Sequence, residues 1–227
     1  MFSHFDPSLL KFMRDLQANN DRQWFNDHKQ QYEDLVRSPS LAFIEQMEQW
    51  IPLISPHYEA SPKKIGGSLM RIYRDVRFSK NKAPYKTNVG IKFRHEVGKS
   101  AHAPGFYLHI AADKIFLGVG IWQPDRAPLM AIRDHIVTKP GPYLDAIEHE
   151  PFTEFYQLTG TKLIRPPKGY DKEHALIEEI KRKDFIAVCQ LEERELYQQD
   201  FCKMVASRFA RAQPFQKFIC ESLGLRF

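Results

Sequence analysis

The chain has 227 residues, of which 43% are hydrophobic and 13% are aromatic, which is enough to bury a substantial core. Charged residues make up 27% of the chain, and apolar residues occur along its whole length, which argues against global disorder. The three cysteines form no CxxC pair, so we expect no disulfide framework and a cytoplasmic protein. No run approaches the roughly 18 apolar residues that cross a bilayer, and we expect no membrane association.

Positive charge is concentrated in one part of the chain. The formal net charge is +5. Residues 71–94 contain eight basic side chains and one acidic side chain, a net charge of +7, so the rest of the chain carries −2. This local excess favours a focused anion-binding site over a uniformly cationic protein.

The first fifty residues have the pattern of helices. Asp6 followed by Pro7 is typical of an N-cap and the first helical position, and the sequence from Asn19 to Asp21 can end one helix and cap the next. Apolar residues recur at helical spacing in three groups. These groups contain Leu9, Leu10, Met13 and Leu16; Trp24, Phe25, Tyr32 and Leu35; and Leu41, Ile44, Met47 and Ile51.

The middle of the chain alternates between apolar and polar residues and predicts strands. This pattern with a period of two covers residues 69–78, 89–94, 106–111 and 115–122. The short link at residues 112–114 predicts that the last two strands form a hairpin. An antiparallel sheet with one face packed on helices follows from this pattern.

Helical spacing returns after the predicted sheet. We expect helices over residues 129–137, 143–149, 196–212 and 215–223. Residues 183–191 fit either a strand or a buried helix. The fold class is therefore α+β, with a central antiparallel sheet of about four or more strands flanked by N- and C-terminal helices. No repeat or linker divides residues 1–227, which we expect to form a single domain.

Five blocks spread along the chain resemble the DUF2461 family. They occur in the family's order and span most of the sequence. The blocks are NNDRQWFNDHKQQY (19–32), RIYRDVRFSKNKAPYKTN (71–88), GFYLHI (105–110), GVGIWQP (118–124) and LIRPPKGYDKEHA (163–175). The family name assigns no reaction, so the resemblance implies a shared domain and supplies no catalytic residues.

The second block holds most of the candidate binding residues. If residues 71–88 form two strands joined by a loop, Arg71, Asp75 and Arg77 lie on one face. Arginine matches carboxylate or phosphate oxygens with paired hydrogen bonds, and Asp75 could orient one guanidinium. The loop adds donors suited to a polyanion. These are Ser79, Lys80, Lys82, Tyr85 and Lys86.

A structural interpretation of the same residues stays open. The RDVR sequence could form an internal Arg–Asp network that ties the loop to the sheet. Arg74 falls on the apolar side of the pattern and fits that interpretation best, because a buried arginine must be paired. The lysines could equally occupy a solvated loop tip.

The sequence offers little support for a particular chemistry. It contains no Walker loop, no GxGxxG after a strand, no GxSxG and no HExxH, and we predict no metal site. The three cysteines lie in apolar surroundings and are expected to be core thiols. His109 could share a surface with Arg71 and Arg77. Asp75, Tyr85 and His109 are the nearest candidates for a general base or nucleophile, and the catalytic residues and the cofactor stay unassigned.

The sequence therefore predicts a protein that binds a phosphorylated or otherwise anionic small molecule through a basic β-hairpin region. Two alternatives remain open. One is a module that binds nucleic acid, because aromatic residues accompany the basic segments. The other is a protein-interaction domain in which the Arg/Asp cluster is structural. The oligomeric state is not indicated.

Overall fold

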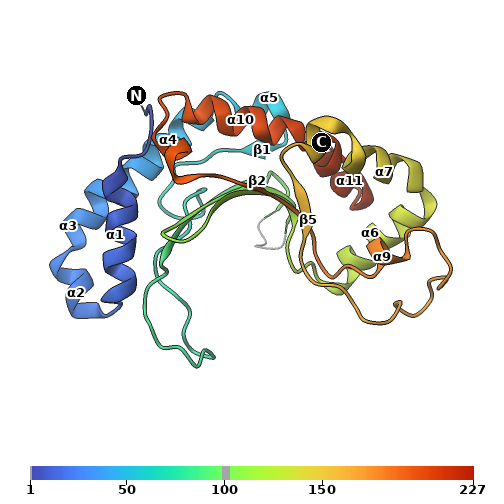
Figure 1. The fold of residues 1–227 in the computed structure, drawn as a ribbon, viewed down its shortest axis with the longest axis horizontal. Helices are drawn as coiled ribbons and strands as arrows, with labels where there is room; N and C mark the ends of the chain where they lie inside the picture. The colour runs from blue at the N-terminus through green and yellow to red at the C-terminus, as the bar shows by residue number, and fades with distance from the viewer. Residues whose placement is uncertain (1, 99–102) are drawn as a thin grey trace.

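The computed structural model describes residues 2–98 and 103–227 and has an α+β fold. Short helices occupy the N-terminal part (Figure 1). They are α1 (Pro7–Ala18), α2 (Arg22–Asp27), α3 (Lys29–Tyr32), the π-helical turn η1 (Glu33–Arg37), α4 (Ser38–Met47) and α5 (Ile51–Ile54). The predicted caps are confirmed, because Asp6 accepts from the Ser8 amide and Asp21 accepts from the Trp24 amide.

Six antiparallel strands form one sheet in the order β1-β2-β3-β4-β6-β5. The strands are β1 (Tyr58–Glu59), β2 (Asn88–His95), β3 (Gly105–Ala111), β4 (Ile115–Ile121), β5 (Gln157–Thr159) and β6 (Phe185–Gln190). The β3–β4 hairpin is confirmed. The ambiguous residues 183–191 form a strand, β6, which lies between β4 and β5.

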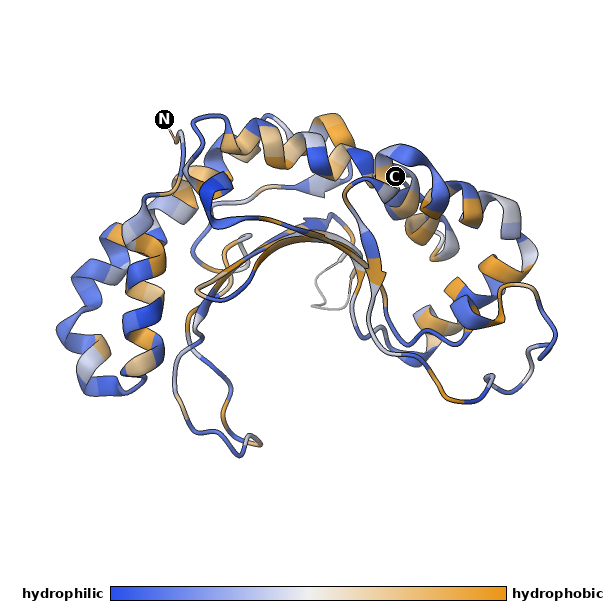
Figure 2. Ribbon diagram, in the orientation of Figure 1, coloured by the Kyte–Doolittle hydropathy of each residue, from blue (hydrophilic) through white to orange (hydrophobic). Residues whose placement is uncertain are grey.

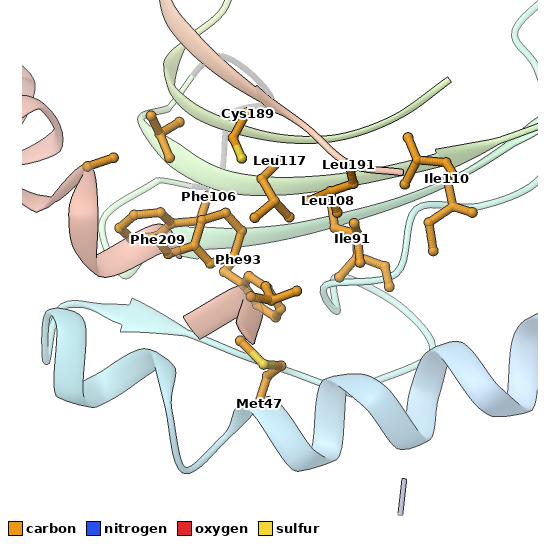
Figure 3. Close-up of a cluster of buried hydrophobic side chains, with 14 of the residues drawn as sticks. Met47, Ile91, Phe93, Phe106, Leu108, Ile110, Leu117, Cys189, Leu191 and Phe209 are labelled. Carbon is orange, nitrogen blue, oxygen red and sulfur yellow. The ribbon is translucent and has the colours of Figure 1, made fainter. Parts of the chain in front are cut away.

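Alternation along the strands sorts their side chains onto two different faces. One face is fully buried and packs against α4 and α10 (Phe201–Arg211), where Met47 and Phe209 meet the sheet (Figure 3). Its strand residues include Ile91, Phe93, Phe106, Leu108, Ile110, Leu117 and Cys189. Burying a large aliphatic or aromatic side chain contributes about 1.5–3 kcal/mol, so this face is the main source of stability.

The opposite face of the sheet is concave and carries half-buried side chains. Helices α4, α5 and α10 lie along the convex side, while α1–α3 and α6 (Arg126–Thr138) flank the two ends (Figures 1 and 2). The side chains of the concave face are Lys92, Arg94, Tyr107, His109, Phe116, Ile186 and Val188.

Further helices complete the C-terminal half. They are α7 (Pro140–Glu148), α8 (Glu150–Thr153), α9 (Ile177–Ile180), the 3-10 turn η2 (Glu193–Tyr197) and α11 (Gln213–Ser222). The helix expected over residues 196–212 instead begins at Phe201, after η2. All three cysteines are buried and free, as expected for core thiols. Within the described ranges, no helix is both long enough and apolar enough to cross a membrane.

The expected strand over residues 69–78 is wrong. The segment makes only isolated bridges, from Leu69 to Ile91 and from Tyr73 to Tyr85. Two features limit the pairing. Pro84 on the opposite limb has no amide hydrogen to donate, and Phe78, which the alternation placed on the apolar side, is 96% exposed. Because the alternate side chains toward Phe78 have no surface to pack on, the alternating sequence does not extend the backbone pairing between the two limbs.

Gly120 allows β4 and β6 to approach closely, and this provides a test of the sheet. Its φ is +105°, and an added Cβ would lie 2.1 Å from the Phe185 carbonyl oxygen. We expect Gly120→Ala to lower the free energy of unfolding by about 2 kcal/mol or more. The control is Gly141→Ala in α7, where a Cβ would meet no heavy atom within 4 Å. Chemical denaturation should show the control unchanged or slightly stabilised, and equal stability of the two variants would contradict this account.

Candidate functional site

The basic segment forms an arm, defined here as residues 71–87, that projects from the sheet beside α1 (Figure 1). Its two limbs pair only near the base. The Arg74 amide donates to the Pro84 carbonyl at 2.9 Å, and the Lys86 amide donates to the Ile72 carbonyl at 2.7 Å. The arm is therefore a short hairpin base that carries a long irregular tip.

Asn20 holds the base of the arm against the N-terminal helices. Its side-chain nitrogen donates to the Tyr85 carbonyl at 3.0 Å, and its side-chain oxygen accepts from the Tyr85 amide at 3.1 Å. The Tyr85 ring also stacks on Phe25, with the ring centroids 4.1 Å apart. We refer to the two Asn20–Tyr85 hydrogen bonds as the clasp.

Three charged side chains near the tip of the arm, Asp75, Arg77 and Lys82, contact neighbouring groups of the arm. Asp75 forms an exposed ion pair with Arg77 at 2.7 Å, and the hydrogen bonds from Arg77 lower the pKa of Asp75 to about 2. The Lys82 ammonium donates to the Val76 carbonyl at 3.0 Å. Asp75 thus pairs with its neighbour two residues away and stays on the exposed tip.

Arg74 links the two limbs. Its guanidinium donates to the Ala83 carbonyl at 3.2 Å, and its side chain is half-buried. The pattern placed this arginine on the internal side, and the structure shows an internal contact, although the partner is a carbonyl and not a carboxylate.

A polar cavity of about 340 Å³ lies between the end of α1, the returning limb of the arm and the start of β2. Two of its lining residues, Arg74 and Lys86, are cationic, and none is acidic. Burial and the nearby Arg71 lower the pKa of Lys86. We call this cavity the arm pocket. It is lined by Gln17, Asn20, Arg74, Asn81, Ala83, Tyr85, Lys86, Thr87 and Asn88.

A larger cavity of about 630 Å³ lies beside β6, and its charges are already compensated. There Arg208 forms an ion pair with Glu195. Acidic and basic residues both line this cavity, so it offers no net attraction for an anion.

Beside the arm pocket, His109 and Tyr107 form a dyad on the concave face of the sheet. The Tyr107 hydroxyl lies 3.0 Å from His109 Nδ1, and the side-chain nitrogen of Asn88 lies 3.5 Å from the same atom. Burial lowers the pKa of His109 to about 4 and raises that of Tyr107 to about 12. Both side chains are therefore neutral at physiological pH.

Only some of the predicted site residues come together. Tyr85 and Lys86 line the arm pocket, Arg71 acts electrostatically on Lys86, and His109 reaches the pocket through Asn88. The other predicted residues lie on the arm outside the pocket lining, and these are Asp75, Arg77, Ser79, Lys80 and Lys82. Among residues 2–98 and 103–227, no three His, Cys, Asp or Glu side chains group as a metal site would require.

Sequence reasoning missed the polar residues that complete the pocket. Gln17 and Asn20 come from the end of α1 and the following turn, and Asn88 begins β2. Two of these positions carried a signal, because Asn20 lies in the NNDRQWF block and Asn88 ends the RIYRDVRFSKNKAPYKTN block.

The open six-stranded antiparallel sheet with helices along one face and at both ends defines an α+β protein. A family model described as "Conserved hypothetical protein (DUF2461)" matches residues 8–218. The chain therefore belongs to the DUF2461 family, as the sequence blocks indicated. No curated protein and no solved structure shows significant similarity to it.

The clasp can be tested by removing the Asn20 side chain. Asn20→Ala deletes both hydrogen bonds to Tyr85, and we expect it to lower the free energy of unfolding by about 1–2 kcal/mol. Amide hydrogen exchange at Tyr85 and Lys86 should accelerate. The matched control is Asn19→Ala, whose side-chain nitrogen donates to the Asp15 carbonyl at the end of α1. Equal exchange of the arm in both variants would contradict the role of the clasp.

The His109 pKa gives a second test. We expect the imidazole to titrate near pH 4 by NMR in the folded protein, against about 6.5 in the unfolded chain. The unfolded state then binds more protons between these values, so the contribution of His109 to stability is complete above about pH 6.5 and is lost as pH falls through 4. His109→Gln should flatten that part of the stability profile. A folded-state midpoint near 6.5 would contradict the environment described for His109.

Proposed function

We propose that the protein binds a phosphorylated or otherwise anionic ligand in the arm pocket. The observation that carries the proposal is the lining of this cavity, which includes the Lys86 and Arg74 cations and no carboxylate. A cavity of about 340 Å³ is at the small end of the range typical of ligand sites.

The charge of the pocket supports an anionic ligand. Within the described part of the chain, neither Lys86 nor Arg71 lies within ion-pair distance of a carboxylate. The two cations repel, which contributes to the lowered pKa of Lys86. A bound phosphate would reverse this effect, because a nearby anion favours the charged form of a lysine. Binding should therefore raise the pKa of Lys86.

Neutral hydrogen-bond donors also surround the pocket and could bind phosphate oxygens. Thr87, which carries a hydroxyl, and Asn88, which carries an amide, line the pocket beside Lys86. One nitrogen of the Arg74 guanidinium donates to the Ala83 carbonyl, and the guanidinium has further N–H groups that can donate to a ligand. Guanidinium, ammonium and hydroxyl groups together match the acceptor oxygens of a phosphate better than those of a neutral ligand.

A module that binds nucleic acid is the second candidate, and the tip of the arm favours it. Phe78 is 96% exposed, and the Arg77 guanidinium lies 5.9 Å from its ring centroid. Exposed aromatic rings with adjacent cations are typical of surfaces on which single-stranded bases stack. The two candidates use different parts of the arm, the pocket and the tip, so matched variants at Lys86 and Lys80 can distinguish them.

We expect Lys86→Ala to weaken pyrophosphate binding about tenfold or more in isothermal titration calorimetry, because a hydrogen bond between charged groups contributes about 1.5–3 kcal/mol. Lys80→Ala at the exposed tip removes the same charge and is the control. It should leave pyrophosphate affinity nearly unchanged. Equal losses in both variants would indicate binding through diffuse charge, and absence of any measurable anion binding would refute the proposal.

Salt dependence separates the two candidates further. Binding of a single compact anion should weaken only modestly between 50 and 200 mM salt. Binding of a single strand through several phosphates should weaken steeply, with a slope of about −0.7 per phosphate contact. A steep slope together with a strong effect of Lys80→Ala would favour nucleic acid over the small anion.

A further inference from the structure

The dyad on the concave sheet face is joined to the arm pocket through one residue. Asn88 lines the pocket, and its side-chain nitrogen lies 3.5 Å from His109 Nδ1. With strands about 4.8 Å apart and a rise of about 3.4 Å per residue, the Cα atoms of Asn88 and His109 are about 8 Å apart. A ligand anchored in the pocket can therefore extend over this part of the sheet.

A glycine in β2 makes the dyad possible. Gly90 pairs with His109 across β2 and β3, and an added Cβ at this position would lie 2.9 Å from the Tyr107 hydroxyl oxygen. The absence of a side chain lets the phenol lean over β2 and reach His109 Nδ1.

The contacts at Nδ1 favour one tautomer of the His109 ring. The side-chain nitrogen of Asn88 can only donate, which favours the tautomer in which Nδ1 accepts, from Asn88 and from the Tyr107 hydroxyl, and Nε2 carries the hydrogen. The hydrogen bond to Tyr107 holds the half-buried His109 ring on the concave side of the sheet.

Phe116 extends this surface into β4. Its ring stacks on His109 with the centroids 4.7 Å apart and the planes inclined by 17°, and the Lys114 ammonium lies 5.0 Å from its ring centroid. Side chains stand roughly perpendicular to a sheet, so the two parallel rings present their edges to the open face. Ring edges carry partial positive charge and favour the face of another aromatic ring.

We infer that the anion in the arm pocket is the phosphate of a nucleotide whose base lies across the exposed edges of His109 and Phe116. This inference rests on the proposed anion binding and specifies its ligand. The phosphate meets Lys86 and Thr87, the sugar passes Asn88, and the base receives the edge-to-face contact. A sugar phosphate would fill the pocket and leave the aromatic pair uncovered.

The test compares ligands that differ only in the base. Isothermal titration calorimetry would measure pyrophosphate, ribose 5-phosphate and the four ribonucleoside monophosphates AMP, GMP, CMP and UMP. We expect at least one mononucleotide to bind about tenfold more tightly than ribose 5-phosphate. Lys86→Ala should weaken every ligand that binds. Equal affinity of ribose 5-phosphate and all four mononucleotides would overturn the nucleotide inference and leave anion binding standing.

Variants of the aromatic pair locate the base. Phe116→Leu and His109→Leu should remove most of the advantage of the mononucleotide over ribose 5-phosphate, without changing ribose 5-phosphate itself. Phe78→Leu at the arm tip is the matched aromatic control and should change neither ligand. If Phe78→Leu removes the advantage and the sheet variants keep it, the base lies on the arm and the inference fails.

Two further measurements keep the test decisive. In the unchanged protein, the His109 ring signals should shift more on addition of the mononucleotide than of ribose 5-phosphate, because only the base lies against the ring. This measurement does not depend on the stability of any variant. A ten-residue single-stranded oligonucleotide provides the other comparison. If it binds at least a hundredfold more tightly than any mononucleotide, and this affinity is lost in Phe78→Leu, then the ligand is a nucleic-acid strand and the inference is overturned. Failure of every anion, pyrophosphate included, would instead refute the proposed function.

Discussion

Ile91, Phe93 and Leu108 enter the core together because alternate residues of a strand point to the same face. That face is covered by α4, α10 and α11, and its burial orders the rest of the molecule. The other face cannot turn inward without exposing these apolar side chains, since a shift of one residue exchanges the two faces. The half-buried polar and aromatic residues of the concave side are therefore fixed by the packing of the opposite side.

The arm is attached to the rest of the fold by a much smaller contact than the one that holds the sheet against its helices. Its limbs share few backbone hydrogen bonds, and its base is held by the clasp and by the stacking of Tyr85 on Phe25. The arm pocket exists because this contact brings the end of α1 beside the returning limb. Lys86 then lies among residues with amide and hydroxyl groups, while Arg77 and Lys82 near the tip bind neighbouring groups of the arm.

Local patterns in the sequence were sufficient for the capped first helix and the β3–β4 hairpin, because adjacent residues make those structures. Asn20 and Tyr85 lie 65 residues apart, and nothing in either neighbourhood indicates that they meet. The alternation at residues 69–78 suggested a strand, but a strand needs a partner with free donors and a surface to cover, and the sequence of one limb describes neither. Only one residue of the dyad could be predicted from the sequence. His109 was identified, whereas its link to Tyr107 depends on the absence of a side chain at Gly90.

The clasp also has a thermodynamic consequence. The end of α1, the arm and the start of β2 line the arm pocket, and the first two of these segments separate if the two Asn20 hydrogen bonds open. Ligand binding and arm opening are then linked equilibria. The apparent affinity equals the intrinsic affinity multiplied by the fraction of molecules with the arm closed, and bound ligand stabilises the closed arm by RT ln(1 + [L]/Kd). The hydrogen bonds of a single asparagine in the turn after α1 therefore affect the apparent affinity of the arm pocket for its ligand.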